Sequence, residues 1–240
     1  MNSILESVEW GEPALSLLSQ SRELDPKLPA VMQIRHSERS HISSREERGA
    51  NLTESGRRAA CEFGSSLPIT RSYRLFHSTS DRAKETAEEI HRGLRSIDAE
   101  ACIGGVFIRS HSDQEKLWDY LTRDIISQGE RTARPFFINW ASGHFPPWEL
   151  EPCRMFAQRA ASAMMKNLDN HDTSGFDIYV SHDIWVASCL FYWFGIMPSV
   201  DWIGYLDGFI LQQTDDCMNV YFKDGKKEAY YPYWWGFKPH

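Results

Sequence analysis

The residues best suited to chemistry are a histidine and two arginines near the start of the chain. Residues 29–34 are apolar enough to form a buried strand, and this strand leads directly into Arg35, His36 and Arg39. Guanidinium groups beside an imidazole disfavour its protonated form, because like charges repel. They also bind phosphate oxygens through planar, bidentate contacts. Since a neutral imidazole is a nucleophile, this run predicts a histidine that attacks a phosphorus atom.

Two further groups of polar residues follow predicted strands later in the chain. Arg82 lies in the first turn of a helix predicted for residues 81–94. His182 and Asp183 follow a strand predicted for residues 176–180. Ligands of open α/β sheets bind outside the carboxyl ends of the strands, and a helix N-terminus favours an anion. We therefore expect these side chains to gather around one phosphoryl group and stabilise its charge.

The elements that must position these residues alternate along the chain, which is typical of an α/β sandwich. Strands are predicted at 29–35, 73–78, 176–180, 205–212 and 218–230, the last with a turn at 224–225. Helices are predicted within 1–28 and at 53–64, 81–94, 113–127, 151–168 and 184–194. Thr53 and either Thr79 or Ser80 are suitable N-caps. Residues 134–152 are rich in proline, glycine and aromatics, which favours loops or short turns.

Composition narrows the class of protein. The 240 residues are 42% hydrophobic and 25% charged, which is ordinary for one large soluble domain. The net charge of -7 argues against a nucleic-acid partner. The five cysteines form no C-x-x-C pair and are interpreted as free thiols of a reducing compartment. No apolar stretch approaches the roughly 20 residues of a membrane span, and the acidic N-terminal region does not fit a signal peptide. We expect a cytoplasmic protein without a membrane partner.

Several motifs, in order, resemble those of the histidine phosphatase superfamily, which has the phosphoglycerate-mutase-like fold. The family hallmark is Arg-His-Gly after the first strand, matched by Arg35 and His36. Residues 78–87 resemble its Ser-x-x-x-Arg-Ala-x-x-Thr-Ala segment, and residues 52–56 resemble its Leu-Thr-x-x-Gly segment. His182 is similar to its second histidine. The resemblance implies a three-layer α/β/α sandwich with a mostly parallel central sheet.

The extent of the resemblance suggests the domain organisation. It covers roughly residues 29–213 and is poor between about 95 and 170. We expect residues 1–240 to form a single histidine-phosphatase-like domain. A segment at about 105–152 is expected to be an insertion over the active site.

The resemblance also implies a mechanism with two displacements. His36 would attack phosphorus to form a phosphohistidine, and Asp183 would protonate the leaving group and then take a proton from water. The residues implied in phosphate binding are Arg35, Arg39, Arg82 and His182. Arg39 together with Asp183 makes the site similar to the acid-phosphatase branch. The phosphoglycerate-mutase branch uses a glutamate from mid-chain instead.

One residue departs from the family pattern. Ser37 stands where the family has glycine after the nucleophile. If this position requires an open backbone conformation, serine carries some strain there. Because serine is small, we expect it to be tolerated.

Other kinds of site fit these residues less well. Metal binding by His36, His77 and His182 is disfavoured, since neighbouring arginines repel a cation, and no metal or cofactor is expected. A serine-hydrolase site is not indicated, because the chain lacks a Gly-x-Ser-x-Gly elbow. His144 and Arg45 are the further candidates for contact with the substrate.

The sequence thus predicts a phosphomonoesterase that hydrolyses a small phosphorylated molecule. A weakly active or non-catalytic regulatory relative remains open, as do a phosphoprotein phosphatase and a phosphomutase. The oligomeric state stays undecided. The aromatic run at residues 230–235 would suit either packing on the core or a homodimer contact.

Overall fold

The computed structural model describes residues 3–40, 50–127, 133–170, 175–198, 202–214, 216–223 and 225–235. Within these residues a seven-stranded sheet forms the middle of the molecule, in the order β3-β2-β4-β1-β5-β6-β7. The strands are β1 (Ala30–Arg35), β2 (Ser72–His77), β3 (Ala101–Val106), β4 (Gly175–Ser181), β5 (Gly208–Gln213), β6 (Met218–Phe222) and β7 (Gly225–Ala229). The helices are α1 (Ile4–Ser7), α2 (Glu12–Arg22), α3 (Glu54–Ser65), α4 (Asp81–Ser96), α5 (Gln114–Ser127), α6 (Arg134–Ala141), α7 (Cys153–Leu168) and α8 (Asp183–Phe194).

The centre of the sheet is parallel. β3, β2, β4 and β1 pair in parallel, whereas β5, β6 and β7 extend the sheet in antiparallel pairs. The carboxyl ends of β2, β4 and β1 therefore lie side by side at one edge of the sheet. The predicted α/β sandwich with a mostly parallel central sheet is confirmed.

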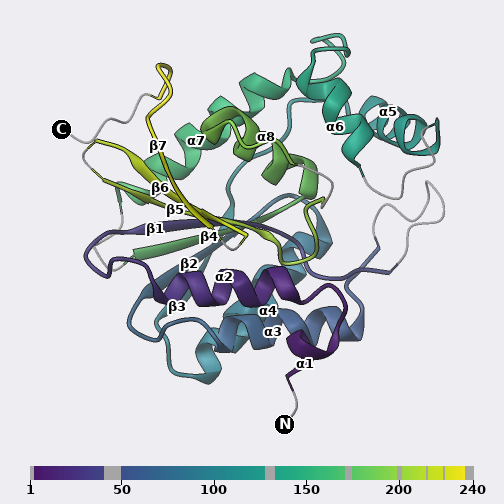
Figure 1. The fold of residues 1–240 in the computed structure, drawn as a ribbon. Helices are drawn as coiled ribbons and strands as arrows, with labels where there is room; N and C mark the ends of the chain where they lie inside the picture. The colour runs from purple at the N-terminus through teal and green to yellow at the C-terminus, as the bar shows by residue number, and fades with distance from the viewer. Residues whose placement is uncertain are drawn as a thin grey trace.

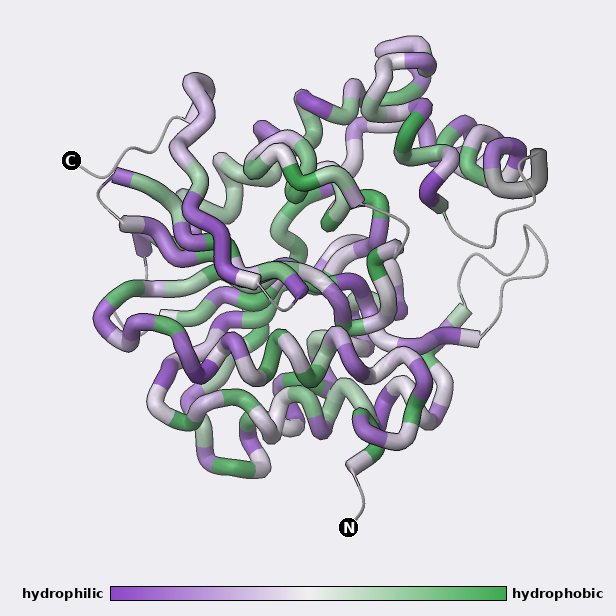
Figure 2. Tube along the Cα trace, in the orientation of Figure 1, coloured by the Kyte–Doolittle hydropathy of each residue, from purple (hydrophilic) through white to green (hydrophobic). Residues whose placement is uncertain are grey.

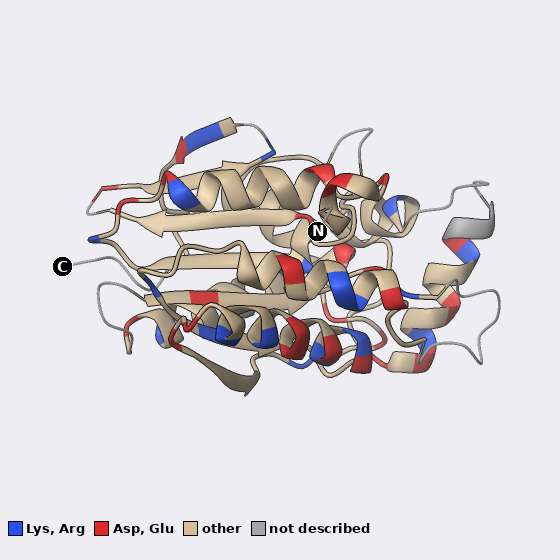
Figure 3. Ribbon diagram, turned by 90° about the horizontal axis from the view of Figure 1, so that it is seen from below, with Lys and Arg blue, Asp and Glu red and all other residues tan. Residues whose placement is uncertain are grey.

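Helices cover both faces of the sheet, which gives three layers (Figure 1). α1 to α4 lie on one face and α5 to α8 on the other. Neighbouring residues of β1 belong to the apolar cores on opposite faces of the sheet. Val31 belongs to the core beneath α7 and α8, and Met32 belongs to the core beneath α2 and α3. Hydrophobic and hydrophilic residues alternate along the helices, and β7 is mainly hydrophilic (Figure 2). Charged residues lie mainly on the helices rather than on the strands (Figure 3).

The helices that border the site begin at the predicted caps. The Thr53 hydroxyl accepts a hydrogen bond from the Gly56 amide at the start of α3. The Ser80 hydroxyl accepts one from the Ala83 amide at the start of α4. Both contacts satisfy amides that have no partner within the helix. Serine 80, rather than its neighbour Thr79, is therefore the cap of α4.

The prediction of loops or short turns at residues 134–152 is wrong for the first part of this segment, where Arg134–Ala141 form helix α6. Pro135 lies in the first turn of that helix. Proline is tolerated there because the missing amide would have had no helical partner. The helix is buried in the apolar core beneath α7 and α8 through Phe136, Phe137 and Trp140. Whether residues 105–152 are an insertion in a single domain stays a prediction.

None of the helices in the described part of the chain combines the length and the hydropathy that a transmembrane span requires.

Candidate active site

Backbone hydrogen bonds extend the parallel ladder one residue past the strand ends. The His36 amide donates to the Ser181 carbonyl over 3.0 Å, and the Ser78 amide donates to the Val180 carbonyl over 3.0 Å. These bonds fix the loops after β1 and β2 against β4. His36 and the residue after Ser181, His182, are thus held at the same edge of the sheet. We call the residues gathered there the histidine–arginine cluster: Arg35, His36, Arg39, Arg82, His182 and Asp183.

His36 is held in the form that a nucleophile requires. Its Nδ1 lies 2.8 Å from the Ser37 carbonyl, and Arg82 Nε donates to its Nε2 over 3.0 Å. A carbonyl only accepts and a guanidinium only donates, so the proton is on Nδ1 and the lone pair on Nε2. The pKa of His36 lies well below 6.5, first because the ring is buried and then because Arg82, Arg35 and His182 oppose its charge. The imidazole is therefore neutral at physiological pH.

His182 has a parallel arrangement on the neighbouring strand. Its ring centroid lies 5.6 Å from that of His36. Its Nε2 lies 3.1 Å from the Ser78 hydroxyl, and Arg82 Nη2 lies 3.4 Å from its Nδ1. Its pKa is also lowered well below 6.5, by burial first and then by the cluster arginines. Arg82 thus bridges the two histidines with different nitrogens of one guanidinium.

The three arginines of the cluster concentrate positive charge. The pKa of Arg82 is lowered to about 10, first by burial and then by Arg39, yet the group stays charged at neutral pH. The pKa of Arg39 is lowered as well, mainly by burial. The Arg35 guanidinium lies over the Tyr205 ring, 4.6 Å from its centroid. The Nε atoms of Arg35 and Arg39 are buried and find no acceptor among the described residues. Such donors are suited to the oxygens of an anion.

Asp183 is the carboxylate of the cluster and the first residue of α8. Its Oδ1 accepts from the Ile184 amide over 2.9 Å, and its Oδ2 accepts from the Trp202 indole over 2.8 Å. The same Oδ2 lies 3.7 Å from Arg35 Nη1. The structure thus brings the predicted acid to the same edge of the sheet as His36.

Ser37 shows no sign of backbone strain. The residues other than glycine with positive φ in the described chain are Asp98, Leu206 and Lys223. The Ser37 amide donates to the Thr86 hydroxyl over 3.0 Å, and its own hydroxyl donates to the Gly56 carbonyl over 2.7 Å. The serine is completely buried. Its hydroxyl therefore joins the loop after β1 to the start of α3, which explains how it is tolerated.

The Leu-Thr-x-x-Gly segment has a packing role beside this loop. A Cβ atom at Gly56 would lie 2.2 Å from the Glu38 carbonyl oxygen. The Glu38 carboxylate accepts hydrogen bonds from the hydroxyls of Thr53 and Ser55 and from the Trp10 indole. Burial raises the pKa of Glu38, but these three bonds outweigh it and leave the pKa lowered. The loop that carries His36 is thus held closely against α3.

The remaining sequence candidates lie elsewhere. His144 is exposed in the turn after α6, where its amide donates to the Asn139 carbonyl, and no described contact joins it to the cluster. Arg45 lies outside the described residues. His77 is buried at the end of β2 with its Nδ1 2.8 Å from the Ser78 carbonyl. Among the described residues, no group of three histidines, cysteines or carboxylates is arranged to hold a metal ion.

Residues just before β5 contribute to the site although the sequence did not indicate them. Trp202 contacts Asp183, the Ile203 carbonyl accepts from Arg35 Nη1 over 2.7 Å, and the Tyr205 ring centroid lies 6.0 Å from that of His36. No motif marks this segment, because its role depends on the antiparallel pairing of β5 beside β1.

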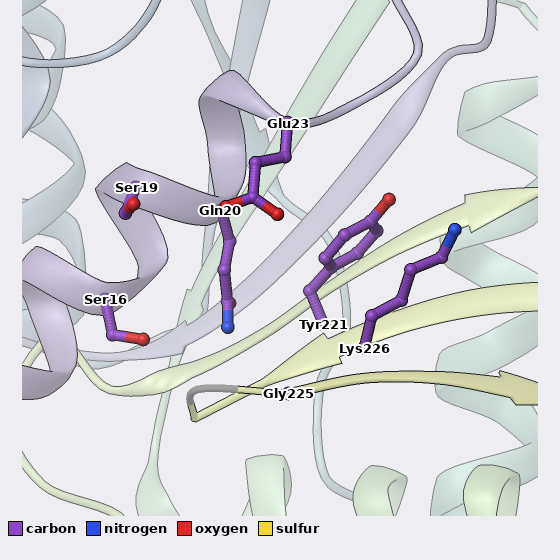
Figure 4. Close-up of a pocket in the computed structure, with 7 residues that line it drawn as sticks. All are labelled: Ser16, Ser19, Gln20, Glu23, Tyr221, Gly225 and Lys226. Atoms are coloured by element: carbon purple, nitrogen blue, oxygen red, sulfur yellow. The ribbon is translucent and has the colours of Figure 1, made fainter.

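A separate cavity of about 210 Å³ lies between α2 and the β6–β7 hairpin (Figure 4). Its lining consists of Ser16, Ser19, Gln20, Glu23, Tyr221, Gly225 and Lys226. It shares no residue with the histidine–arginine cluster and contains neither a histidine nor an arginine. The arrangement capable of chemistry is therefore the cluster at the sheet edge.

Comparison with known proteins agrees with the motifs and the geometry. Residues 31–106 match the family model described as the histidine phosphatase superfamily (branch 1), and this stretch contains His36 and Arg82. This part of the chain is therefore similar to the histidine phosphatase superfamily. The similarity of its site to the acid-phosphatase branch stays a prediction, since the matching model is that of branch 1. No curated protein matches the sequence.

Solved structures of a phosphoglycerate mutase and of a phosphatase share the fold. Phosphoglycerate mutase from Bacillus anthracis str. Sterne is 15% identical, with 87% of this chain and 95% of that chain covered and a TM-score of 0.50. A mycobacterial glucosyl-3-phosphoglycerate phosphatase is 15% identical, with 85% and 98% covered and a TM-score of 0.51. Its complex with inorganic phosphate is also 15% identical, with 88% and 98% covered and a TM-score of 0.51. At such identities the likeness shows the fold alone.

Proposed function

We propose that this protein is a phosphomonoesterase that hydrolyses a small-molecule phosphate ester through a phosphohistidine on His36. The observation that carries the proposal is the hydrogen bond from Arg82 to Nε2 of His36. It fixes a neutral imidazole whose lone pair lies beside a phosphate-binding guanidinium. When a phosphate binds, this guanidinium would exchange the imidazole for a phosphate oxygen.

The charges of the cluster suit a phosphate dianion. Arg35, Arg39 and Arg82 face the single carboxylate of Asp183, so the cluster carries an excess of two positive charges. The buried, unpartnered Nε donors of Arg35 and Arg39 would each gain an acceptor. Donors held in place before the reaction stabilise transition-state charge without reorganising.

The first step forms a bond between His36 Nε2 and phosphorus while the bond to the leaving oxygen breaks. Asp183 gives its proton to that oxygen, which departs as an alcohol. This step requires Asp183 in its protonated form. In the second step water attacks phosphorus, Asp183 takes the water proton, and the bond to Nε2 breaks to release phosphate.

An experiment on Asp183 tests this assignment. Asp183→Asn should lower kcat on an alkyl phosphate about 10²- to 10⁴-fold, the usual contribution of a general acid. Its effect on p-nitrophenyl phosphate should be much smaller, because that leaving group departs without a proton. Equal losses on both substrates would contradict the role of Asp183.

The fold supports phosphate-ester chemistry in general, since a glucosyl-3-phosphoglycerate phosphatase and a phosphoglycerate mutase share it. The presence of all six cluster residues favours an active enzyme over a regulatory relative. Hydrolysis without transfer of the phosphoryl group to a second substrate position would separate a phosphatase from a phosphomutase. The five cysteines are all free, which supports the expectation of a cytoplasmic protein.

A further inference from the structure

The indole of Trp202 reaches the predicted acid from a distant part of the chain. Its Nε1 donates to Asp183 Oδ2 over 2.8 Å, although the two residues lie on different elements. The other carboxylate oxygen is already occupied by the Ile184 amide of α8. Both oxygens of Asp183 are therefore held, one by its own helix and one by Trp202, so the carboxylate plane has a fixed orientation.

The segment that carries Trp202 is itself held against the site. The carbonyl of the next residue, Ile203, accepts from the Arg35 guanidinium over 2.7 Å, and the Asp207 carbonyl accepts from the Arg35 amide over 2.9 Å. The Asp207 carboxylate accepts from the Gly204 amide over 3.0 Å, which fixes the turn between these two contacts. Trp202 thus belongs to a segment that is joined to the strand of the nucleophile.

The indole ring also packs against helix α6. Its centroid lies 5.7 Å from that of Phe137 on α6, and Phe137 is completely buried. A ring held between α6 and Asp183 cannot change rotamer freely, because a move would remove both the packing and the hydrogen bond. Trp202 therefore presents its N–H to Asp183 in one orientation.

We propose that Trp202 is a positioning residue that orients the Asp183 carboxyl for proton transfer to the leaving group. This inference rests on the proposed function. Proton transfer requires the donor within hydrogen-bond reach of the leaving oxygen, and small displacements of a reacting group are costly. An indole N–H donates and never accepts. It therefore holds the carboxyl without competing for the proton that Asp183 must deliver.

The variant Trp202→Phe keeps an aromatic ring against Phe137 and removes the N–H. We expect kcat on an alkyl phosphate to fall about tenfold, as for the loss of one hydrogen bond to a charged group. On p-nitrophenyl phosphate the fall should be about twofold or less, because that reaction depends little on the acid. A purely structural role would lower both rates together.

Trp10→Phe is the matched control. The Trp10 indole also donates to a carboxylate, Glu38 Oε1, over 3.1 Å. Removing that bond should affect the two substrates equally, since Glu38 has no part in proton transfer. A leaving-group dependence in Trp10→Phe as strong as in Trp202→Phe would overturn the proposal.

A double-mutant cycle completes the test. If Trp202 acts through Asp183, adding Trp202→Phe to Asp183→Asn should cause no further loss on the alkyl phosphate, whereas a full additional loss would overturn the proposal. Asp183→Asn could lose more activity on the alkyl phosphate than on p-nitrophenyl phosphate while Trp202→Phe loses the same on both. That result would refute the role of Trp202 and leave the role of Asp183 intact. If Asp183→Asn loses equal activity on both substrates, the assignment of Asp183 as the acid fails, and the role of Trp202 fails with it.

Discussion

Arg82 is the residue whose replacement should disturb the site most selectively. Its Nε donates to Nε2 of His36 over 3.0 Å and its Nη2 lies 3.4 Å from Nδ1 of His182. One guanidinium thus contacts both histidines. Arg82→Ala removes both contacts and one charge. Arg82→Lys keeps the charge but offers a single ammonium, which cannot reach both positions at once.

The expected magnitudes follow from the hydrogen bonds that the Arg82 guanidinium would donate to phosphate oxygens in place of these contacts. A hydrogen bond to a charged group contributes about 1.5–3 kcal/mol. Losing two such bonds raises the barrier by roughly 3–6 kcal/mol, which corresponds to a loss of about 10²- to 10⁴-fold in kcat/KM. Losing one, as in Arg82→Lys, should cost about 10- to 10²-fold. The order wild type, lysine variant, alanine variant is therefore part of the prediction.

The assay is steady-state hydrolysis of p-nitrophenyl phosphate, with urea unfolding to show that each variant is folded. Arg57→Lys is a suitable control, because Arg57 pairs with Glu85 over 3.2 Å outside the cluster. That control should stay within about twofold of wild type, the scale expected for a partly exposed ion pair away from the cluster. A folded Arg82→Ala with kcat/KM within about threefold of wild type would refute the assigned role of the guanidinium.

Two further predictions concern pH and packing. Because the pKa values of His36 and His182 are lowered well below 6.5, kcat/KM should show no acidic limb from either histidine between pH 7 and about 5.5. Below pH 6.5 the unfolded chain binds more protons than the folded protein, so the free energy of unfolding should fall on acidification. A urea midpoint that rises from pH 7 to 5.5 would contradict the burial of two neutral imidazoles. Gly56→Ala would place a methyl group 2.2 Å from the Glu38 carbonyl oxygen, so we expect a loss of about 2–3 kcal/mol in urea unfolding. An unchanged unfolding midpoint would show that the loop after β1 is not packed as closely as described.

The cluster could be predicted because its members follow strands and are marked by type. Buried β1 and β4 are short apolar runs that end in charged or polar residues. Parallel pairing then places their carboxyl ends together whatever the details of the loops. His36, Arg82, His182 and Asp183 could thus be assigned to one site from their positions after strands or at helix starts.

Other elements could not be predicted because local signals opposed them. The sequence did not predict β3, because this strand contains Gly104 and Gly105. It is also the exposed outermost strand of the sheet, so its residues need no apolar alternation. α6 was missed because Pro135 indicated a break. The strand expected from residue 205 begins at Gly208, since Leu206 adopts a positive φ in the preceding turn. In each case the tertiary environment outweighs propensity.

The contribution of Trp202 shows a different limit. From the sequence alone, Trp202 would be expected to pack in the apolar core, because most tryptophans do so. Only the placement of β5 beside β1 and of α8 after β4 brings the indole to Asp183. Contacts between segments that are distant in sequence and carry no motif require the structure.

Trapping of the covalent intermediate tests the central claim most directly. The enzyme would be quenched during turnover of a ³²P-labelled phosphate ester, and the label would be located by peptide mapping. We predict an acid-labile, base-stable phosphate on His36 that is absent from His36→Ala. Turnover by His36→Ala at the wild-type rate, or a phosphate on another residue, would contradict the account.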